Sequence, residues 1–122
     1  MKLQSDAAPG LNMVTAYGPG FVVVNGVRHT SPVIVLPERT LPWALAGFEA
    51  LAEAHAAALA ALAPEVVLLG TGARQRFPHP ALLQPLARAR IGVEVMDTHA
   101  ACRTYNILVA EGRKAAAALL LA

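Results

Sequence analysis

Two short apolar segments with a helix-length stretch between them constrain the fold of this chain most strongly. Residues 65–69 and 91–96 are rich in valine, leucine or isoleucine, as strands buried inside a sheet usually are. Between them, the GTG sequence at 70–72 marks a turn, and residues 81–90 carry leucines at a helical spacing. This succession predicts two parallel strands joined by a right-handed crossover. The turn at 70–72 and the polar segment that begins at Asp97 should therefore meet at one edge of the sheet.

The first third of the chain predicts a β-meander. Apolar, β-branched and aromatic runs alternate there with turn sequences, namely GPG at 18–20 and the pair Asn25-Gly26. This pair is a strong hairpin signal, because both central residues of a type I′ turn have positive φ. The expected strands are residues 13–17, 21–24, 27–30 and 33–36.

Residues 41–63 contain one open assignment and one helix. Pro42 fits either the first turn of a helix or an edge strand that carries Trp43 inward. From 48 to 63, three leucines and His55 lie on one face and two glutamates lie on the other, which predicts a helix. We therefore expect His55 to pack against the core rather than to bind a ligand.

Composition limits the size and the environment of the domain. A chain of 122 residues with 56% hydrophobic content can bury one core, so we predict a flexible N-terminus at 1–10 and a single α/β domain at 11–122. Only 15% of the residues are charged, which leaves apolar surface for a subunit or partner contact. The net charge of +2 and the scattered arginines argue against nucleic-acid binding. Without a secretory signal, a membrane-length apolar run or a pair of cysteines, we expect a cytoplasmic protein.

Residues 97–113, with the sequence DTHAACRTYNILVAEGR, gather most of the chemically versatile side chains. Asp97 or Thr98 is placed to cap a helix through its side-chain oxygen. Ile107 lies roughly opposite the core-facing side of that helix, so the helix is apolar on two sides and we expect a partner to cover it. A helical projection places Cys102, Tyr105 and Val109 on a stripe that faces the core. His99, Arg103 and Asn106 form a neighbouring polar stripe.

Each polar group in this region has a functional interpretation beside a structural one. The GTG turn either binds an anion through its backbone N–H groups or is only a tight turn. Asp97 either caps the helix or pairs with Arg103 or Arg113 across a cleft. Cys102 is either a thiolate activated near His99 or an inert core residue, and its stripe favours the core. The candidate cleft residues are Gly70, Thr71, Gly72, Asp97, Thr98, Arg103, Asn106, Glu111 and Arg113.

The polar residues at 103–113 also have two interpretations as a group. They form a structural net of ion pairs and hydrogen bonds that ties the helix to the loop after Met96, or they recognise a carboxylate, a phosphate or a partner peptide. No spacing of histidines, cysteines and carboxylates matches a zinc or non-haem iron site, so we expect no metal and no cofactor.

Four motifs together resemble those of a known family. They are YGPG at 17–20, VNG at 24–26, LLGTG at 68–72 and MDTHAACRTYNILVAEGR at 96–113. Over about residues 11–121 the chain resembles a bacterial-type member of the domain-of-unknown-function family that includes mitochondrial respiratory complex I assembly factor 3 and the adipogenesis-associated domain-containing proteins. The resemblance implies a mixed central sheet between layers of helix and additional β structure. It also implies action through protein contacts, with no settled reaction or cofactor.

The resemblance also bears on the C-terminal tail. The alanine-rich residues 114–121 favour a helix by propensity, whereas the family implies a final strand there. We adopt the strand, because tertiary context can override propensity.

We therefore predict an α/β fold, a single three-layer domain with a mixed central sheet, an N-terminal β-meander and a parallel βαβ unit. Its predicted function is that of a small binding or assembly module that contacts another protein or a second copy of itself, with a cleft for a small anionic ligand. The alternative is an enzyme or metabolite sensor that uses the cleft between 70–72 and 97–113. We expect no nucleic-acid partner and no transmembrane segment.

Overall fold

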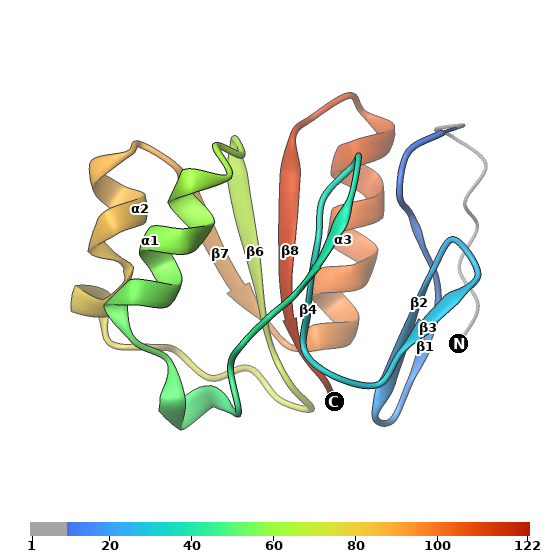
Figure 1. Ribbon diagram of the computed structural model, residues 1–122, viewed down its shortest axis with the longest axis horizontal. Coiled ribbons are helices and arrows are strands. Elements are labelled where there is room, and N and C mark those ends of the chain that lie inside the picture. Colours follow the sequence, from blue (N-terminus) through green and yellow to red (C-terminus); the bar gives the residue numbers. More distant parts are fainter. Residues whose placement is uncertain (1–9) are drawn as a thin grey trace.

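Residues 10–122, which the computed structural model describes, form a small sheet beside a larger sheet that has helices on both faces (Figure 1). The predicted flexible segment 1–10 lies outside the described residues except for Gly10. Within the described part, no helix has the length and apolar character needed to cross a bilayer.

The small sheet is the predicted meander. Its antiparallel strands are β1 (Val14–Gly18), β2 (Phe21–Val24) and β3 (Val27–His29), in that order. Asn25 and Gly26 between β2 and β3 have φ values of 47° and 83°, as the expected turn requires.

The fourth expected strand, β4 (Val33–Val35), leaves the meander and pairs in the larger sheet. All of its residues are buried, and a strand that is apolar on both sides needs a sheet covered on both faces. In the larger sheet β4 pairs antiparallel with β5 (Thr40–Pro42), so the open assignment at Pro42 resolves to an edge strand. Trp43 is buried directly after it.

The larger sheet is mixed, in the order β5-β4-β8-β6-β7. The strand β6 (Val66–Thr71) pairs parallel with β7 (Gly92–Met96), which confirms the predicted parallel unit. It also pairs parallel with β8 (Ala115–Leu120), whereas β4 pairs antiparallel with β8. The alanine-rich tail is therefore a strand, and a central one.

The two helices that precede β6 and β7 are shorter than the sequence predicts. The helix expected at 48–63 is α1 (Glu53–Ala61), preceded by a separate 3-10 turn at Phe48–Ala50. The imidazole of His55 accepts a hydrogen bond from Ala52 N–H at 3.0 Å, which satisfies a backbone donor where α1 begins.

The helix expected at 81–90 is a 3-10 turn, Pro80–Leu83, followed by α2 (Gln84–Arg88). Pro85 explains the division, because a residue without an N–H group fits only the first turn of an α-helix.

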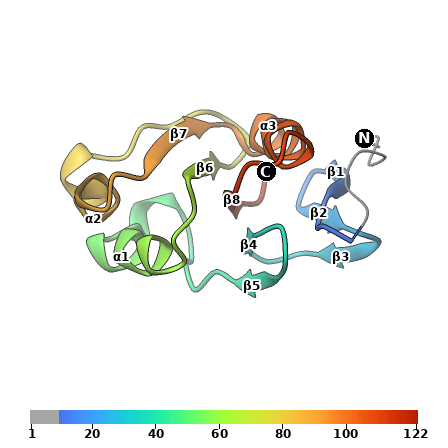
Figure 2. The same cartoon turned by 90° about the horizontal axis from the view of Figure 1, so that it is seen from above.

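Three layers result, as predicted. The helix α3 (Thr98–Ala110) and the meander cover one face of the larger sheet, and α1 and α2 cover the other face (Figure 2). Side chains of β6 and β8 alternate between the two cores, so Leu68 and Ala117 belong to the first, and Leu69 and Ala118 to the second.

Candidate functional site

The turn after β6 and the start of α3 meet at one edge of the sheet, as the strand succession predicts, but they bond to each other directly. Thr98 N–H donates to Gly72 O at 2.9 Å, and Gly72 N–H donates to Thr98 Oγ1 at 2.8 Å. The Thr98 hydroxyl donates in turn to Leu120 O at the end of β8, and Thr98 is fully buried. These bonds occupy the space between the turn and the helix.

Gly70 is needed for the same close approach. A Cβ atom at this position would lie 3.0 Å from Thr98 Oγ1 and 3.1 Å from Thr98 Cα. The hydroxyl could turn away, whereas the helix backbone could not. The glycine therefore has a packing role at this point, apart from any anion-binding role of the turn.

Asp97 and Thr71 have local backbone partners. Asp97 Oδ1 accepts from Ala100 N–H at 2.9 Å, which confirms the predicted helix cap. Thr71 Oγ1 accepts a hydrogen bond from Arg76 N–H at 3.0 Å and donates one to Arg74 O at 2.7 Å. Thr71 therefore fixes the loop that follows β6.

Asn106 joins α3 to the meander. Its Oδ1 accepts from Val14 N–H and its Nδ2 donates to Val14 O, both at 2.8 Å. A side-chain amide thus occupies the free edge of β1 in the way that a neighbouring strand would. Arg103 donates to the Tyr17 hydroxyl at 2.7 Å, and the His99 ring stacks on Tyr17 at a centroid distance of 4.2 Å. This net ties the helix to the meander, not to the loop after Met96 as the sequence interpretation had it.

The remaining cleft candidates lie far from Asp97. Glu111 and Arg113 follow the C-terminal end of α3, a helix of 13 residues and therefore about 20 Å long. Arg113 lies 3.7 Å from a carboxylate oxygen of Glu65, so Asp97 has neither Arg103 nor Arg113 as an ion-pair partner within residues 10–122. The structure thus brings Gly70, Thr71, Gly72, Asp97 and Thr98 together and places Arg103, Asn106, Glu111 and Arg113 elsewhere.

Cys102 lies in the core of α3, as its stripe predicts. It is fully buried, and burial raises the pKa of its thiol to about 12. His99 faces Tyr17 on the meander side. A thiol in this environment is protonated at neutral pH and is a poor nucleophile.

A pocket of about 500 Å³ opens on the other side of the Thr71–Gly72 turn. Its lining contains two arginines, Arg74 and Arg76, and no carboxylate. Arg76 donates to Glu49 and lies over the Phe48 ring at 4.3 Å, and this hydrogen bond holds the pKa of the Glu49 carboxyl below its usual value. This pocket was not expected from the sequence, although the RQR triplet at 74–76, one residue after the GTG turn, marks it.

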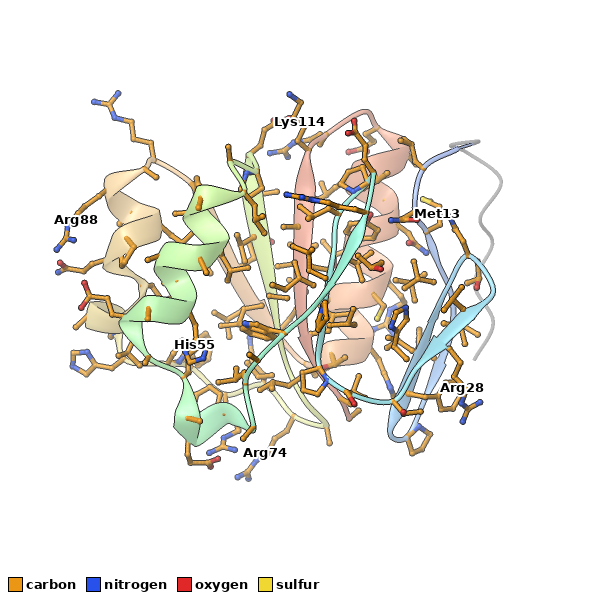
Figure 3. All side chains as sticks on the ribbon, viewed as in Figure 1. Met13, Arg28, His55, Arg74, Arg88 and Lys114 are labelled. Atoms are coloured by element: carbon orange, nitrogen blue, oxygen red, sulfur yellow. The ribbon has the colours of Figure 1, made fainter. Side chains whose placement is uncertain are left out.

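Arg74 has no ion-pair partner in the part of the chain that the structure describes. Its side chain points away from the sheet at the edge where β6 and β8 end (Figure 3). Arg74 therefore places a positive charge at the rim of the pocket, where it also contributes to lowering the pKa of the Glu49 carboxyl. Its other lining residues are Thr30, Pro32, Ala46, Gly47, Phe48, Leu120 and Leu121.

Large apolar side chains are also exposed outside these groups. Ile107, which the sequence places opposite the core, is 58% exposed on α3, and Phe77 is 72% exposed in the loop between β6 and α2. Exposed aromatic and large aliphatic side chains are typical of contact surfaces.

A meander and a helix on one face of a mixed sheet, with two helices on the other, define a class of small α/β domains already seen in solved structures. A crystal structure of a protein from Bordetella parapertussis aligns with a TM-score of 0.87 and 45% identity, over 93% of this chain and 98% of that chain. A solution structure from Bordetella pertussis, described as an Mth938-like domain, aligns with a TM-score of 0.81 and 41% identity, over 98% and 92% of the two chains.

The family follows from the sequence match. The profile described as "Protein of unknown function (DUF498/DUF598)" matches residues 14–120, and the chain belongs to this family. Relatives named NADH dehydrogenase [ubiquinone] 1 alpha subcomplex assembly factor 3 are 37% identical in Danio rerio and 34% in Homo sapiens, each over 97% of this chain. The chain covers 68% and 65% of those proteins, or about two thirds of their length. An uncharacterized protein of Rhodobacter capsulatus is 39% identical over 88% of this chain and 82% of its own length. The family expected from the motifs is confirmed.

Proposed function

We propose that this protein is a binding module of the cytoplasm that assists the assembly of a larger protein complex through protein–protein contacts and catalyses no reaction. One observation carries the proposal: the polar side chains of 97–106 use their hydrogen-bonding groups within the fold. Asp97, Thr98 and Asn106 bond to backbone groups, and Cys102 is buried. A catalytic site needs such groups facing a substrate instead.

The exposed apolar side chains support the same proposal. Ile107 is 58% exposed in the middle of α3, and burying a side chain of this size is worth about 1.5–3 kcal/mol when a partner covers it. The low proportion of charged residues, 15%, is consistent with surface that is covered in an assembly.

The names of the relatives suggest a first protein complex to test, an NADH dehydrogenase. Deleting the gene in its host should reduce the fully assembled enzyme on native gels, and the wild-type gene should restore it. Ile107→Lys should restore it poorly, because a charge at this position resists burial in a contact. Ala87→Lys adds the same charge at an exposed position on α2, on the opposite face of the sheet, and serves as the matched control.

Two results together would reject the proposal. They are normal assembly of the enzyme in the deletion strain and a purified protein that is strictly monomeric by gel filtration with light scattering and recovers no partner from the host.

The pocket beside Thr71 and Gly72 favours a second candidate function, binding of a small anionic ligand by a metabolite sensor or enzyme. Its volume of about 500 Å³ lies within the range of small-molecule sites, and Arg74 and Arg76 supply positive charge. Phosphate, citrate or a nucleotide should then raise the melting temperature of the wild type but not that of Arg74→Ala. Arg39→Ala, at another exposed arginine, is the control, and an unchanged melting temperature with all three probes rejects this function.

A further inference from the structure

Two pockets lie beside the segment that joins β3 to β4. The first is the pocket of about 500 Å³ at the Thr71–Gly72 turn, which we call the turn pocket. The second, the strand pocket, has a volume of about 370 Å³ and lies where β3, β4 and β5 come together. Thr30 and Pro32 line both pockets. The two pockets are therefore neighbours, and a ligand that occupies both must cross residues 30–32.

The side chains that line both pockets are positively charged or neutral. Arg74 and Arg76 line the turn pocket, and Arg28 and His29 line the strand pocket. No aspartate or glutamate is among the residues that line either pocket. The combined surface therefore favours a ligand with negative charge.

This lack of carboxylates is not shared by the pocket at the opposite end of β8. That pocket, of about 530 Å³, includes Glu38 beside Arg39 and Lys114. Figure 3 shows Lys114 at the upper end of the molecule, and Arg28 and Arg74 at the lower end. The lower end is thus the one at which pocket linings carry positive charge alone.

Two of the arginines are available to a ligand. Arg28 and Arg74 have no ion-pair partner within residues 10–122, whereas Arg76 donates to Glu49. Arg74 also lowers the pKa of the Glu49 carboxyl, but from beyond ion-pair distance. The guanidinium of Arg28 lies over the Phe21 ring at 3.8 Å. Stacking of this kind restrains the guanidinium and leaves the N–H groups at its edge free to donate.

The segment between the two pockets lets a ligand pass. Thr30 and Ser31 are exposed and neutral, and their hydroxyl groups can donate or accept hydrogen bonds. Phe48 and Leu121 add apolar lining on the side of the turn pocket. A small anion fits into one pocket, whereas a ligand that contacts both free arginines has to be elongated.

We propose that an acidic, extended segment of a partner protein binds across residues 30–32, with one carboxylate at Arg28 and another at Arg74. This proposal rests on the protein-binding function proposed above, and it names the surface and the chemistry of the partner. Each guanidinium can donate two parallel hydrogen bonds to a carboxylate, which fixes the position of the segment as well as its charge. An apolar side chain between the carboxylates contacts Phe48 and Leu121.

A second copy of this chain does not supply such a segment. Its Glu49, Glu53 and Glu65 are already in ion pairs, and Asp97 caps α3. Among the strands that the structure describes, Glu94 in β7 is the only carboxylate. An extended segment with two carboxylates therefore comes from another protein.

Fluorescence anisotropy with labelled synthetic peptides tests the elongated contact. Each peptide carries two pairs of glutamates, separated by three, five or seven neutral residues that include one leucine, since an extended chain advances about 3.3 Å per residue. At the best spacing, binding should be about fivefold tighter than that of a peptide with the same composition and its four glutamates adjacent. Equal affinities would indicate general attraction between charges and would overturn the proposal.

Arginine variants test the two contacts separately. Arg28→Ala and Arg74→Ala should each weaken binding of the best peptide roughly two- to fivefold. Arg90→Ala removes the same charge from an exposed position that lines neither pocket, so it should leave the affinity unchanged. A loss in Arg74→Ala with none in Arg28→Ala would place the ligand in the turn pocket alone and overturn the proposal. Equal losses in all three variants would also overturn it.

NMR chemical shifts map the contact on the protein. The peptide should shift the amide resonances of Thr30 and Ser31 between the pockets, of Gly72 in the turn pocket and of Thr40 in the strand pocket. Shifts confined to the turn pocket would contradict binding across residues 30–32. A single-stranded uridine oligonucleotide that bound as tightly as the peptide would also overturn the proposal, because the partner would then be a nucleic acid.

Complementation separates this proposal from the proposed function. In the deletion strain, the Arg28→Ala, Arg74→Ala double variant should restore the NADH dehydrogenase poorly, once circular dichroism has verified its fold. If it restores assembly as well as the wild type does, the acidic-segment proposal fails and the assembly function stands. If deletion of the gene leaves assembly intact, the assembly function fails, and the peptide experiments still decide whether an acidic segment binds across the two pockets.

Discussion

Polar side chains of α3 replace backbone groups in the hydrogen bonding of the sheets. Asn106 presents an amide oxygen and an amide N–H to Val14, as a residue of a neighbouring strand would. Thr98 connects Gly72 with Leu120 through one hydroxyl. The residue types that look functional in the sequence are therefore required by the fold.

Asn106→Ala should lower the free energy of unfolding by about 1–3 kcal/mol, because it leaves a buried N–H and a buried C=O of Val14 without partners. Urea unfolding followed by circular dichroism measures the loss. Ile107→Ala, at the exposed next position, should change stability by less than about 0.5 kcal/mol. Equal stability of Asn106→Ala and the wild type would contradict the role of the amide.

Cys102 should make the protein less stable at alkaline pH. Burial raises the pKa of its thiol from 9.0 to about 12, so between these values the unfolded state loses the proton and the folded state keeps it. The free energy of unfolding is unaffected by this group below pH 9.0 and falls above it, by at most about 1.4 kcal/mol per pH unit. Burial raises the pKa of Tyr105 as well, which adds to the loss at the upper end. Urea unfolding from pH 8 to 11 should show a smaller decline in Cys102→Ala, and equal declines would contradict the assignment.

At the scale of elements, the central position of β8 determines how the strands of the larger sheet are joined. Its sequence, AAAALL, favours a helix by propensity, yet it forms a central strand between β4 and β6 with every residue buried. The small side chains of Ala115 and Ala117 on the face toward α3 let this helix pack closely on the strand. The packing of neighbouring elements, which a local propensity does not include, outweighs the helical preference.

The start of α3 closes the edge where β6 and β8 end. Thr98→Val keeps the shape of the side chain but leaves Gly72 N–H and Leu120 C=O without the hydroxyl, so stability should fall by roughly 2–4 kcal/mol. Thr98→Ser keeps the hydroxyl and should lose clearly less in the same urea titration. If the serine and valine variants were equally stable, the hydroxyl would not be what joins these elements.

At the scale of the whole molecule, the meander packs into the first core through residues such as Val14, Tyr17 and Val22, and hydrogen bonds also hold it there. Asn106 holds β1, the Tyr105 hydroxyl donates to Asn12 O at 2.9 Å, and Gly20 N–H donates to Ala122 O at 2.7 Å. The larger sheet has its own second core with α1 and α2 on the opposite face. The meander can therefore open while that second core stays intact.

Native-state hydrogen exchange should show this difference directly. Amides of β1 and β2 should exchange through an opening of lower free energy than those of β6 and β8. Val67→Ala, in the second core, should speed exchange in β8 without changing that in the meander, whereas Asn106→Ala should speed both. A single shared opening free energy for all four strands would show that the layers unfold together.

Most strands and helices up to α3, the hairpin at Asn25-Gly26, the parallel pairing of β6 with β7 and the core position of Cys102 follow from the sequence, because turn chemistry and hydrophobic periodicity act locally. The segment at Pro42 was left open, and β8 was expected as a strand only from the family resemblance. The two segments around Gly72 and Thr98 were also correctly expected to meet. Whether they leave a cleft depends on hydrogen bonds between residues far apart in the chain, and these bonds bring the turn and the helix into direct contact. The partners of Asn106 and Arg103, the transfer of β4 to the larger sheet and the two pockets that share Thr30 and Pro32 were likewise decided by tertiary structure, since each depends on which element lies next to which.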